Sequence, residues 1–210
     1  MTICERCNNE LLGRQYDPAL HRMSRKVGQV LRVAKRCALP PRVPVSIKPQ
    51  RVARAVVGHL LAAEEIAPGV ARRAPLLEEM RDFFLDETAE LPKSLRLYWW
   101  PYRGHQRVTI LRGVSVLFGF TQVSPPPTVI GDFLKFFPLS FWLTSKMPQS
   151  IASQIADLEI DPRGLSMDDE EELSVATMAS DTFASDWPEH PTGYQVLLMN
   201  GDACVVAEPA

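Results

Sequence analysis

Proline placement limits this chain to short, frequently interrupted elements of secondary structure. The sequence holds 18 prolines in 210 residues, well above the usual share of roughly 5%. Proline lacks a backbone N–H and fixes φ, so it ends helices and is kept out of central strands. Pro40-Pro41 and the run from Pro125 to Pro127 should therefore separate neighbouring elements. We expect several short helices and strands rather than a few long ones.

The composition is that of a globular protein with an apolar core, because 46% of the residues are apolar and 23% are charged. The length suits one ordinary domain or two small ones. No window approaches 18 consecutive apolar residues, which excludes an ordinary membrane-spanning helix, and the first residues lack the pattern of a secretory signal. Four cysteines are too few for a disulfide scaffold. We expect a cytoplasmic protein with no membrane partner.

Charge is distributed very unevenly along the chain. Residues 1–75 carry 14 Lys and Arg against 5 Asp and Glu, whereas residues 156–210 carry 1 against 13. This polarity indicates either an N-terminal region that faces nucleic acid or two parts of the chain that attract each other. An acidic segment that only keeps the protein soluble is the third alternative.

The basic charge is concentrated on one predicted helix, residues 18–36, which begins after Asp17 as a cap with Pro18 at the first helical position. Its apolar side chains recur at spacings of three and four: Leu20, Met23, Val27, Val30, Leu31 and Ala34. Five cations fall on the opposite side of the helix: Arg22, Arg25, Lys26, Arg32 and Arg36. We interpret these five as candidate contacts to DNA or RNA, with a solvated cationic surface as the alternative.

The remaining pattern predicts an α+β fold, with the basic helical part packed on a mostly antiparallel sheet. Helices are expected over about 50–65 and 75–86, with His59 as a hydrogen-bonded core residue. Strands are expected over 95–102, 107–118 and 128–142. A hairpin turn at residues 103–106 is expected to join the first two strands.

Beyond these strands we expect an acidic extension. The predicted parts are residues 1–36, an α+β core over 37–150, and an acidic extension over 151–210. The charge run from Asp168 to Glu172 is typical of a loop or a frayed helix. Asn200-Gly201 predicts a terminal hairpin. Asp132 and Lys135 interrupt the most apolar stretch and are interpreted as polar residues of an edge strand, with a buried pair or site residues as the alternatives.

The strongest chemical signal is Cys4-x-x-Cys7-Asn8. Two thiolates at this spacing can hold one Zn²⁺, but a structural site needs four ligands. Neither Cys37 nor Cys204 completes a second pair at such spacing. A redox-active pair is the alternative chemistry for this spacing. No glycine-rich phosphate loop and no nucleophile elbow occurs in the sequence.

The stretch ICERCNN at residues 3–9, followed by Leu12-Gly13 and DPAL at 17–20, resembles the second half of an HNH endonuclease domain, the ββα-metal fold. The resemblance covers about 18 residues. It implies that Cys4 and Cys7 belong to a zinc knuckle and that Asn8 matches the family's last metal-binding position. The family's general-base histidine and its first CxxC pair lie upstream of this point, and here only three residues precede Cys4.

The sequence thus predicts an HNH-endonuclease-related protein that binds nucleic acid without nuclease activity of its own. An HNH-type enzyme is expected only if the true start lies upstream. A degenerate relative and a coincidental CxxCN are the other interpretations. In the last of these, the chain is a non-enzymatic interaction or accessory module of a phage or mobile element.

A second nucleic-acid surface is suggested by aromatic residues of the first strand. Alternation places Tyr98, Trp100 and Tyr102 on one face, where bases can stack if the rings are exposed. Core packing is the alternative use of these rings.

Overall fold

The computed structural model describes residues 4–63, 75–103, 108–118, 128–145, 147–177, 187 and 195–199. The helical elements are η1 (Cys7–Tyr16), α1 (Asp17–Ala34), α2 (Pro49–Ala62), α3 (Pro75–Leu85), α4 (Gln149–Ala152) and η2 (Ala156–Leu158). The strands are β1 (Arg42–Ile47), β2 (Leu95–Pro101), β3 (Thr109–Phe118), β4 (Thr128–Phe136), β5 (Leu139–Ser145), β6 (Glu159–Ile160), β7 (Glu171–Ala176) and β8 (Gln195–Met199).

Prolines open the three main helices, each at a position where the missing N–H costs nothing. Pro18 lies in the first turn of α1, and Pro49 and Pro75 are the first residues of α2 and α3. The three predicted helices are therefore found within a few residues of their expected bounds.

The strands form two antiparallel sheets. One has six strands in the order β6-β2-β5-β4-β3-β8, and the other is the two-stranded β1–β7 ribbon. Every pairing between described strands is antiparallel. The predicted α+β class with antiparallel sheets is confirmed.

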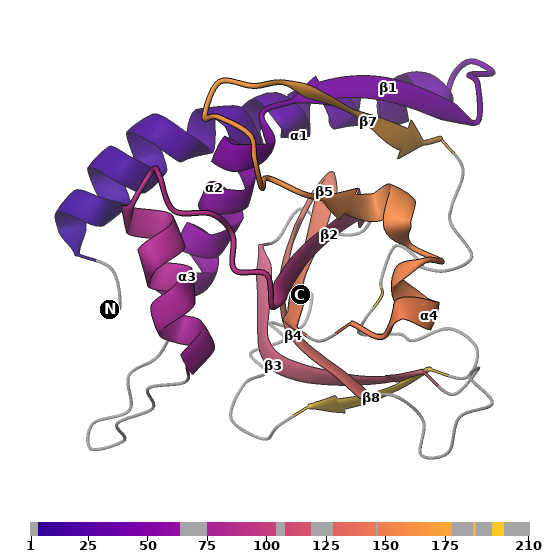
Figure 1. Cartoon of the computed structure of the whole chain (residues 1–210). Helices are drawn as coiled ribbons and strands as arrows, with labels where there is room; N and C mark the ends of the chain where they lie inside the picture. Colours follow the sequence, from indigo (N-terminus) through magenta and orange to yellow (C-terminus); the bar gives the residue numbers. More distant parts are fainter. Residues whose placement is uncertain are drawn as a thin grey trace, which may run out of the picture.

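The helices α1, α2 and α3 lie on one side of the six-stranded sheet, and the β1–β7 ribbon runs beside α1 (Figure 1). The main core joins these helices to one face of the sheet. Leu97 and Trp99 of β2 and Phe141 of β5 enter this core. Helix α2 is buried along most of its length, as its apolar sequence predicts.

The second face of the sheet is also covered. Tyr98 and Trp100 of β2 pack there with Phe133, Trp142 and Trp187. These rings are at most 1% exposed. The sequence-based idea that Tyr98, Trp100 and Tyr102 stack nucleic-acid bases is therefore wrong, because Tyr102 is only 6% exposed as well.

The predicted hairpin between the first two strands of the sheet is wrong. β2 pairs with β5 and β6, whereas β3 pairs with β4 and β8. The sheet order places β5 and β4 between them, so the connection crosses the sheet. Residues 104–107 of the expected turn lie outside the described residues.

Asp132 and Lys135 do not lie on an edge strand, because β4 is flanked by β5 and β3. Asp132 accepts a hydrogen bond from the Gly113 N–H at 2.7 Å and pairs with Arg112 at 3.0 Å. Lys135 is 1% exposed and holds its ammonium group 4.6 Å from the Tyr102 ring centroid. Asp132 and Lys135, the two charged residues in this apolar stretch, therefore lie within the sheet and have partners there.

The acidic segment contributes strands β6 and β7, the second of which ends at Ala176, to the two sheets. β6 pairs with β2, and β7 pairs with β1 over Arg42–Ile47. Glu171 and Glu172 belong to strand β7, so the expectation of a loop or frayed helix fails for the end of the charge run. Of the predicted terminal hairpin, β8 pairs with β3, and its second strand lies outside the described residues.

Candidate nucleic-acid interface

Helix α1 has one buried face and one charged face, as its sequence pattern predicts. Its buried residues are Ala19, Leu20, Met23, Val27, Gly28 and Leu31. They pack on η1, α2 and β1, which leaves the opposite side of the helix to solvent.

Three of the five predicted cations are exposed along α1 and in the turn that follows it. Arg25 and Arg32 are seven residues apart on α1, so at ~100° per residue they project within about 20° of one another, and Arg36 lies in the turn after the helix ends at Ala34. All three side chains are exposed. None of them forms an ion pair or side-chain hydrogen bond with another residue that the structure describes. We call these three residues the arginine stripe.

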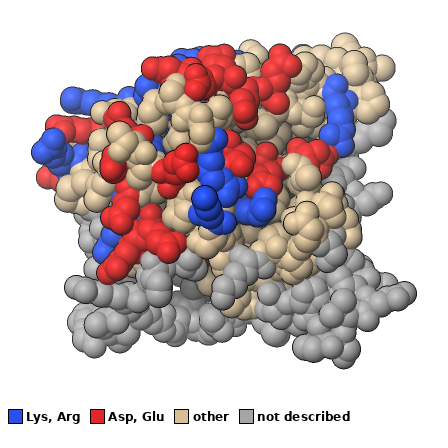
Figure 2. Space-filling view, in the orientation of Figure 1, with Lys and Arg blue, Asp and Glu red and all other residues tan. Residues whose placement is uncertain are grey.

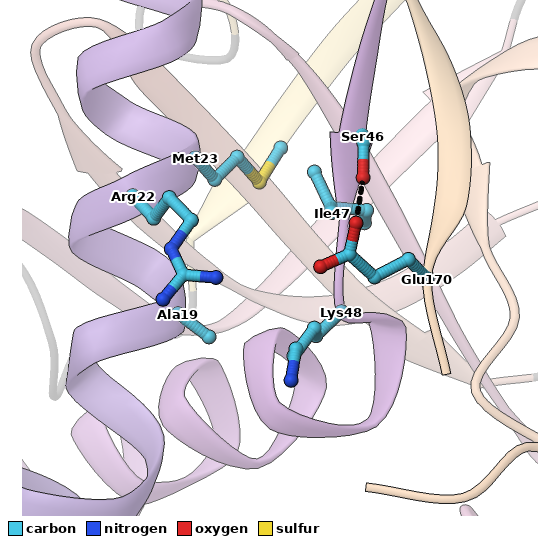
Figure 3. Close-up of a pocket in the computed structure, with 7 residues that line it drawn as sticks. All are labelled: Ala19, Arg22, Met23, Ser46, Ile47, Lys48 and Glu170. Atoms are coloured by element: carbon cyan, nitrogen blue, oxygen red, sulfur yellow. Dashed lines mark hydrogen bonds between the residues drawn. The ribbon is translucent and has the colours of Figure 1, made fainter. Parts of the chain in front are cut away.

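The other two predicted cations face the β1–β7 ribbon instead. The Lys26 ammonium group donates a hydrogen bond to the Ser46 carbonyl at 2.7 Å. Arg22 lines a small hollow with Lys48 and Glu170 (Figure 3). The hollow measures about 10 Å³, which is barely enough for one water molecule. It is an internal contact rather than a ligand site.

Glu170 and Asp168 bring the acidic segment against the basic one. The Ser46 hydroxyl donates to Glu170 at 2.5 Å, as the close-up shows (Figure 3). Asp168 accepts from Lys48 at 2.8 Å and from Arg51 at 3.2 Å. The Ser46 hydrogen bond lowers the pKa of Glu170, and the Lys48 hydrogen bond lowers the pKa of Asp168.

The charge polarity of the sequence is thus partly satisfied within the fold. A further pair joins Arg42 of β1 to Asp157 at 2.6 Å. Figure 2 shows acidic and basic side chains interleaved over the described part of this face. Attraction between two parts of the chain, one of the three interpretations of the polarity, applies to Lys48, Arg51 and Arg42. The residues of the arginine stripe take no part in it.

Cys4 and Cys7 lie at the start of the N-terminal helical segment with their Sγ atoms 2.9 Å apart. The Cys7 N–H also donates to Cys4 Sγ at 3.2 Å. The hydrogen bond between the thiols lowers the pKa of Cys4 and raises that of Cys7. The pair gives two converging sulfur ligands.

A complete metal site does not appear among the described residues. No group of three or more His, Cys, Asp and Glu that could hold an ion is found there. Asn8 is exposed, and its N–H donates to the Cys4 carbonyl at 2.9 Å, as one turn of helix requires. Zinc binding by Cys4, Cys7 and Asn8 stays a prediction, since two thiols fill half of a tetrahedral shell.

His59 does not lie in the core. Its side chain is 36% exposed, and its Nε2 atom lies 3.0 Å from a carboxylate oxygen of Asp17. This contact joins the end of α2 to the start of α1, so His59 has a structural partner that the spacing on its own helix did not reveal.

The sequence-based prediction did not include two further cations that lie near the stripe. Lys35 and Arg103 line a hollow with Arg32 at the end of α1. Lys35 comes directly before Arg36 in the sequence. Helical periodicity therefore places it on a different side of the predicted helix from the five predicted cations. Arg103 is 68 residues further along the chain and approaches only through the fold.

Comparison with known proteins returned no relative: no protein-family model, curated protein or solved structure matches the chain. Among the helices that the structure describes, none is long and apolar enough to cross a membrane.

Proposed function

We propose that this protein binds nucleic acid through the arginine stripe of α1 and the turn that follows it. The observation that carries the proposal is the exposure of Arg25 and Arg32 on one side of a well-anchored helix, with Arg36 exposed in the next turn of the chain. Arginine suits phosphate because its planar guanidinium presents several donors and keeps its charge at all physiological pH values.

The length of the stripe fits a phosphate backbone. The 11 residue steps from Arg25 to Arg36, the last two of them beyond the end of α1, correspond to about 16 Å if each rises 1.5 Å as in a helix. Each strand of a nucleic-acid duplex carries a phosphate roughly every 3.4 Å along its axis. Three arginines over this distance can therefore contact phosphates of one strand without needing any base-specific contact.

The proposed interface contains three cations, whereas the sequence analysis predicted five. Arg22 and Lys26 face the β1–β7 ribbon, and Lys26 already donates to the Ser46 carbonyl. Their contribution to a nucleic-acid complex would require breaking contacts inside the protein. The proposal assigns the binding to the three residues of the stripe.

The proposal concerns binding and assigns no cleavage chemistry. The relation to HNH endonucleases rests on Cys4, Cys7 and Asn8 and stays a prediction. A ββα nuclease needs a histidine to activate water and a bound divalent metal. The three arginines of the stripe supply neither role, because a guanidinium stays protonated and does not bind a cation, so we expect the stripe to bind RNA or DNA without altering it.

The test compares two variants with equal charge change. Arg25→Gln/Arg32→Gln/Arg36→Gln removes the stripe, and Arg6→Gln/Arg14→Gln/Lys93→Gln removes three exposed cations from outside α1. Fluorescence anisotropy with labelled single-stranded DNA, duplex DNA and RNA gives the affinities at low salt. We expect at least a tenfold loss for the stripe variant, or about 1.4 kcal/mol, and a smaller loss for the control. Equal losses, or no binding by the unmodified protein, would overturn the proposal.

A further inference from the structure

The arginine stripe ends at a hollow where four parts of the chain meet. It lies between the last turn of α1, the end of β2, the turn between β4 and β5, and the end of β7. The described residues that line it are Leu31, Arg32, Ala34, Lys35, Arg103 and Phe137, with Thr177 at its edge. We call it the cationic hollow.

The lining of the cationic hollow is positively charged. Arg32 and Lys35 reach it from α1, and Arg103 comes from the segment that follows β2. None of the lining residues that the structure describes is acidic. Arg42 and Lys48, by contrast, each have a carboxylate partner, Asp157 and Asp168. Cations that converge without a carboxylate favour an anion from outside.

The Arg103 guanidinium is held in place before any ligand binds. Its Nη2 atom donates to the Thr177 carbonyl at 2.5 Å. Thr177 is itself fixed, because its N–H donates to the Pro41 carbonyl at 3.0 Å. One edge of the guanidinium is therefore occupied by the protein, while its remaining donors can reach a ligand. Such pre-orientation reduces the entropy that binding would otherwise cost.

The size of the hollow suits a small ligand. Its volume is about 70 Å³, roughly half of the ~150 Å³ cavity that accommodates a benzene ring. A single tetrahedral oxyanion is therefore of suitable size for it. Leu31, Ala34 and Phe137 supply an apolar wall, which lowers the local dielectric and strengthens the attraction between the cations and an anion.

We propose that the cationic hollow binds one phosphate group through Lys35, Arg103 and Arg32. For the source of that phosphate the inference rests on the proposed function, in which a nucleic-acid backbone lies along the stripe and places one phosphate at its end. A free phosphate ester presents the same group, so the experiment below separates the two sources.

The test uses inorganic phosphate and a labelled oligonucleotide as separate probes. Backbone amide NMR shifts of the full chain, followed during addition of sodium phosphate at constant ionic strength, report occupancy of the hollow. The pocket variants are Lys35→Gln and Arg103→Gln, and Lys93→Gln is the matched control at an exposed cation outside both the hollow and the stripe. Lys35 forms no hydrogen bond or ion pair with another described residue, so its variant keeps the test valid if Arg103→Gln impairs folding through Thr177.

We expect saturable shifts around Thr177 and Lys35, and at least a fivefold weaker phosphate affinity in Lys35→Gln with no change in Lys93→Gln. A parallel loss of oligonucleotide affinity in Lys35→Gln identifies the nucleic-acid backbone as the source. Saturable, Lys35-dependent phosphate binding without oligonucleotide binding supports the hollow as a site for a free phosphate ester and refutes the proposed function alone. Shifts that do not saturate, or an equal effect of Lys93→Gln, would overturn the hollow as a phosphate site.

Discussion

Arg54 shows how a single buried charge holds two elements together. Its side chain is 0% exposed, and its guanidinium donates to the carbonyls of Asp86 at 2.8 Å, Glu87 at 3.1 Å and Ala89 at 2.7 Å. Its Cζ atom lies 4.2 Å from the Phe83 ring centroid. Arg54 thereby caps the chain that leaves α3 and fastens it to α2.

Replacing Arg54 with methionine should lower the free energy of unfolding by about 3 kcal/mol, because the carbonyls of Asp86, Glu87 and Ala89 lose a buried, charged donor. Urea denaturation measures the change. The control is Arg25→Met on the exposed face of α1, for which a change within about 0.5 kcal/mol is expected. Equal effects of the two variants would mean that the Arg54 contacts contribute nothing beyond surface charge.

Cys4 should be the more reactive thiol of the CxxC pair. The hydrogen bond with Cys7 and the Cys7 N–H lower the pKa of the Cys4 thiol, and the thiolate is the nucleophile. Alkylation by iodoacetamide in the presence of a chelator and a reductant, read by peptide mass spectrometry, should modify Cys4 at lower pH than Cys7. In Cys7→Ala the pH midpoint for Cys4 should rise. An unchanged midpoint would show that Cys7 does not stabilise the thiolate.

At the scale of elements, local patterns predicted helices well and strand partners poorly. The helices expected over 18–36 and 50–65 are found at Asp17–Ala34 and Pro49–Ala62, because helix caps, prolines and apolar spacing act within the segment itself. Strand pairing depends on distant residues. β7 pairs with β1 about 130 residues earlier, and nothing in the run from Asp168 to Glu172 indicates that partner.

The contact of this acidic run with β1 and α2 should weaken in acid. Asp168 and Glu170 have pKa values below their ordinary values of 3.8 and 4.5. A carboxyl group with a depressed pKa in the folded state stabilises the fold above its unfolded pKa, and that contribution is lost as the pH falls through the folded pKa.

The double variant Asp168→Asn/Glu170→Gln should therefore be slightly less stable than the unmodified protein at neutral pH and equally stable at about pH 2. The effect is small because both carboxylates are exposed and their ion pairs are screened by solvent. Urea midpoints across this pH range test the prediction. A stability difference that persists in strong acid would show that packing, not charge, accounts for it.

For the whole molecule, composition and periodicity were enough for the α+β class and for a cationic face on α1. Composition and periodicity did not predict which residues form the proposed interface. The stripe separates from Arg22 and Lys26 only because β1 and β7 lie beside one flank of the helix. Arg103 joins Lys35 through a sheet whose strand order no local pattern encodes. Attraction between two parts of the chain was one of three sequence-based interpretations of the charge polarity, and the ion pairs of Arg42, Lys48 and Arg51 agree with it.

The salt dependence of duplex DNA binding is the most direct test of the arginine stripe as the nucleic-acid interface. Each phosphate neutralised by a cation contributes about −0.9 to the slope of log Kobs against log salt concentration. Removing Arg25, Arg32 and Arg36 together should therefore make the slope shallower by roughly 2.7. The matched Arg6, Arg14 and Lys93 variant should keep most of the original slope. A stripe variant that retains the slope of the unmodified protein would contradict the account.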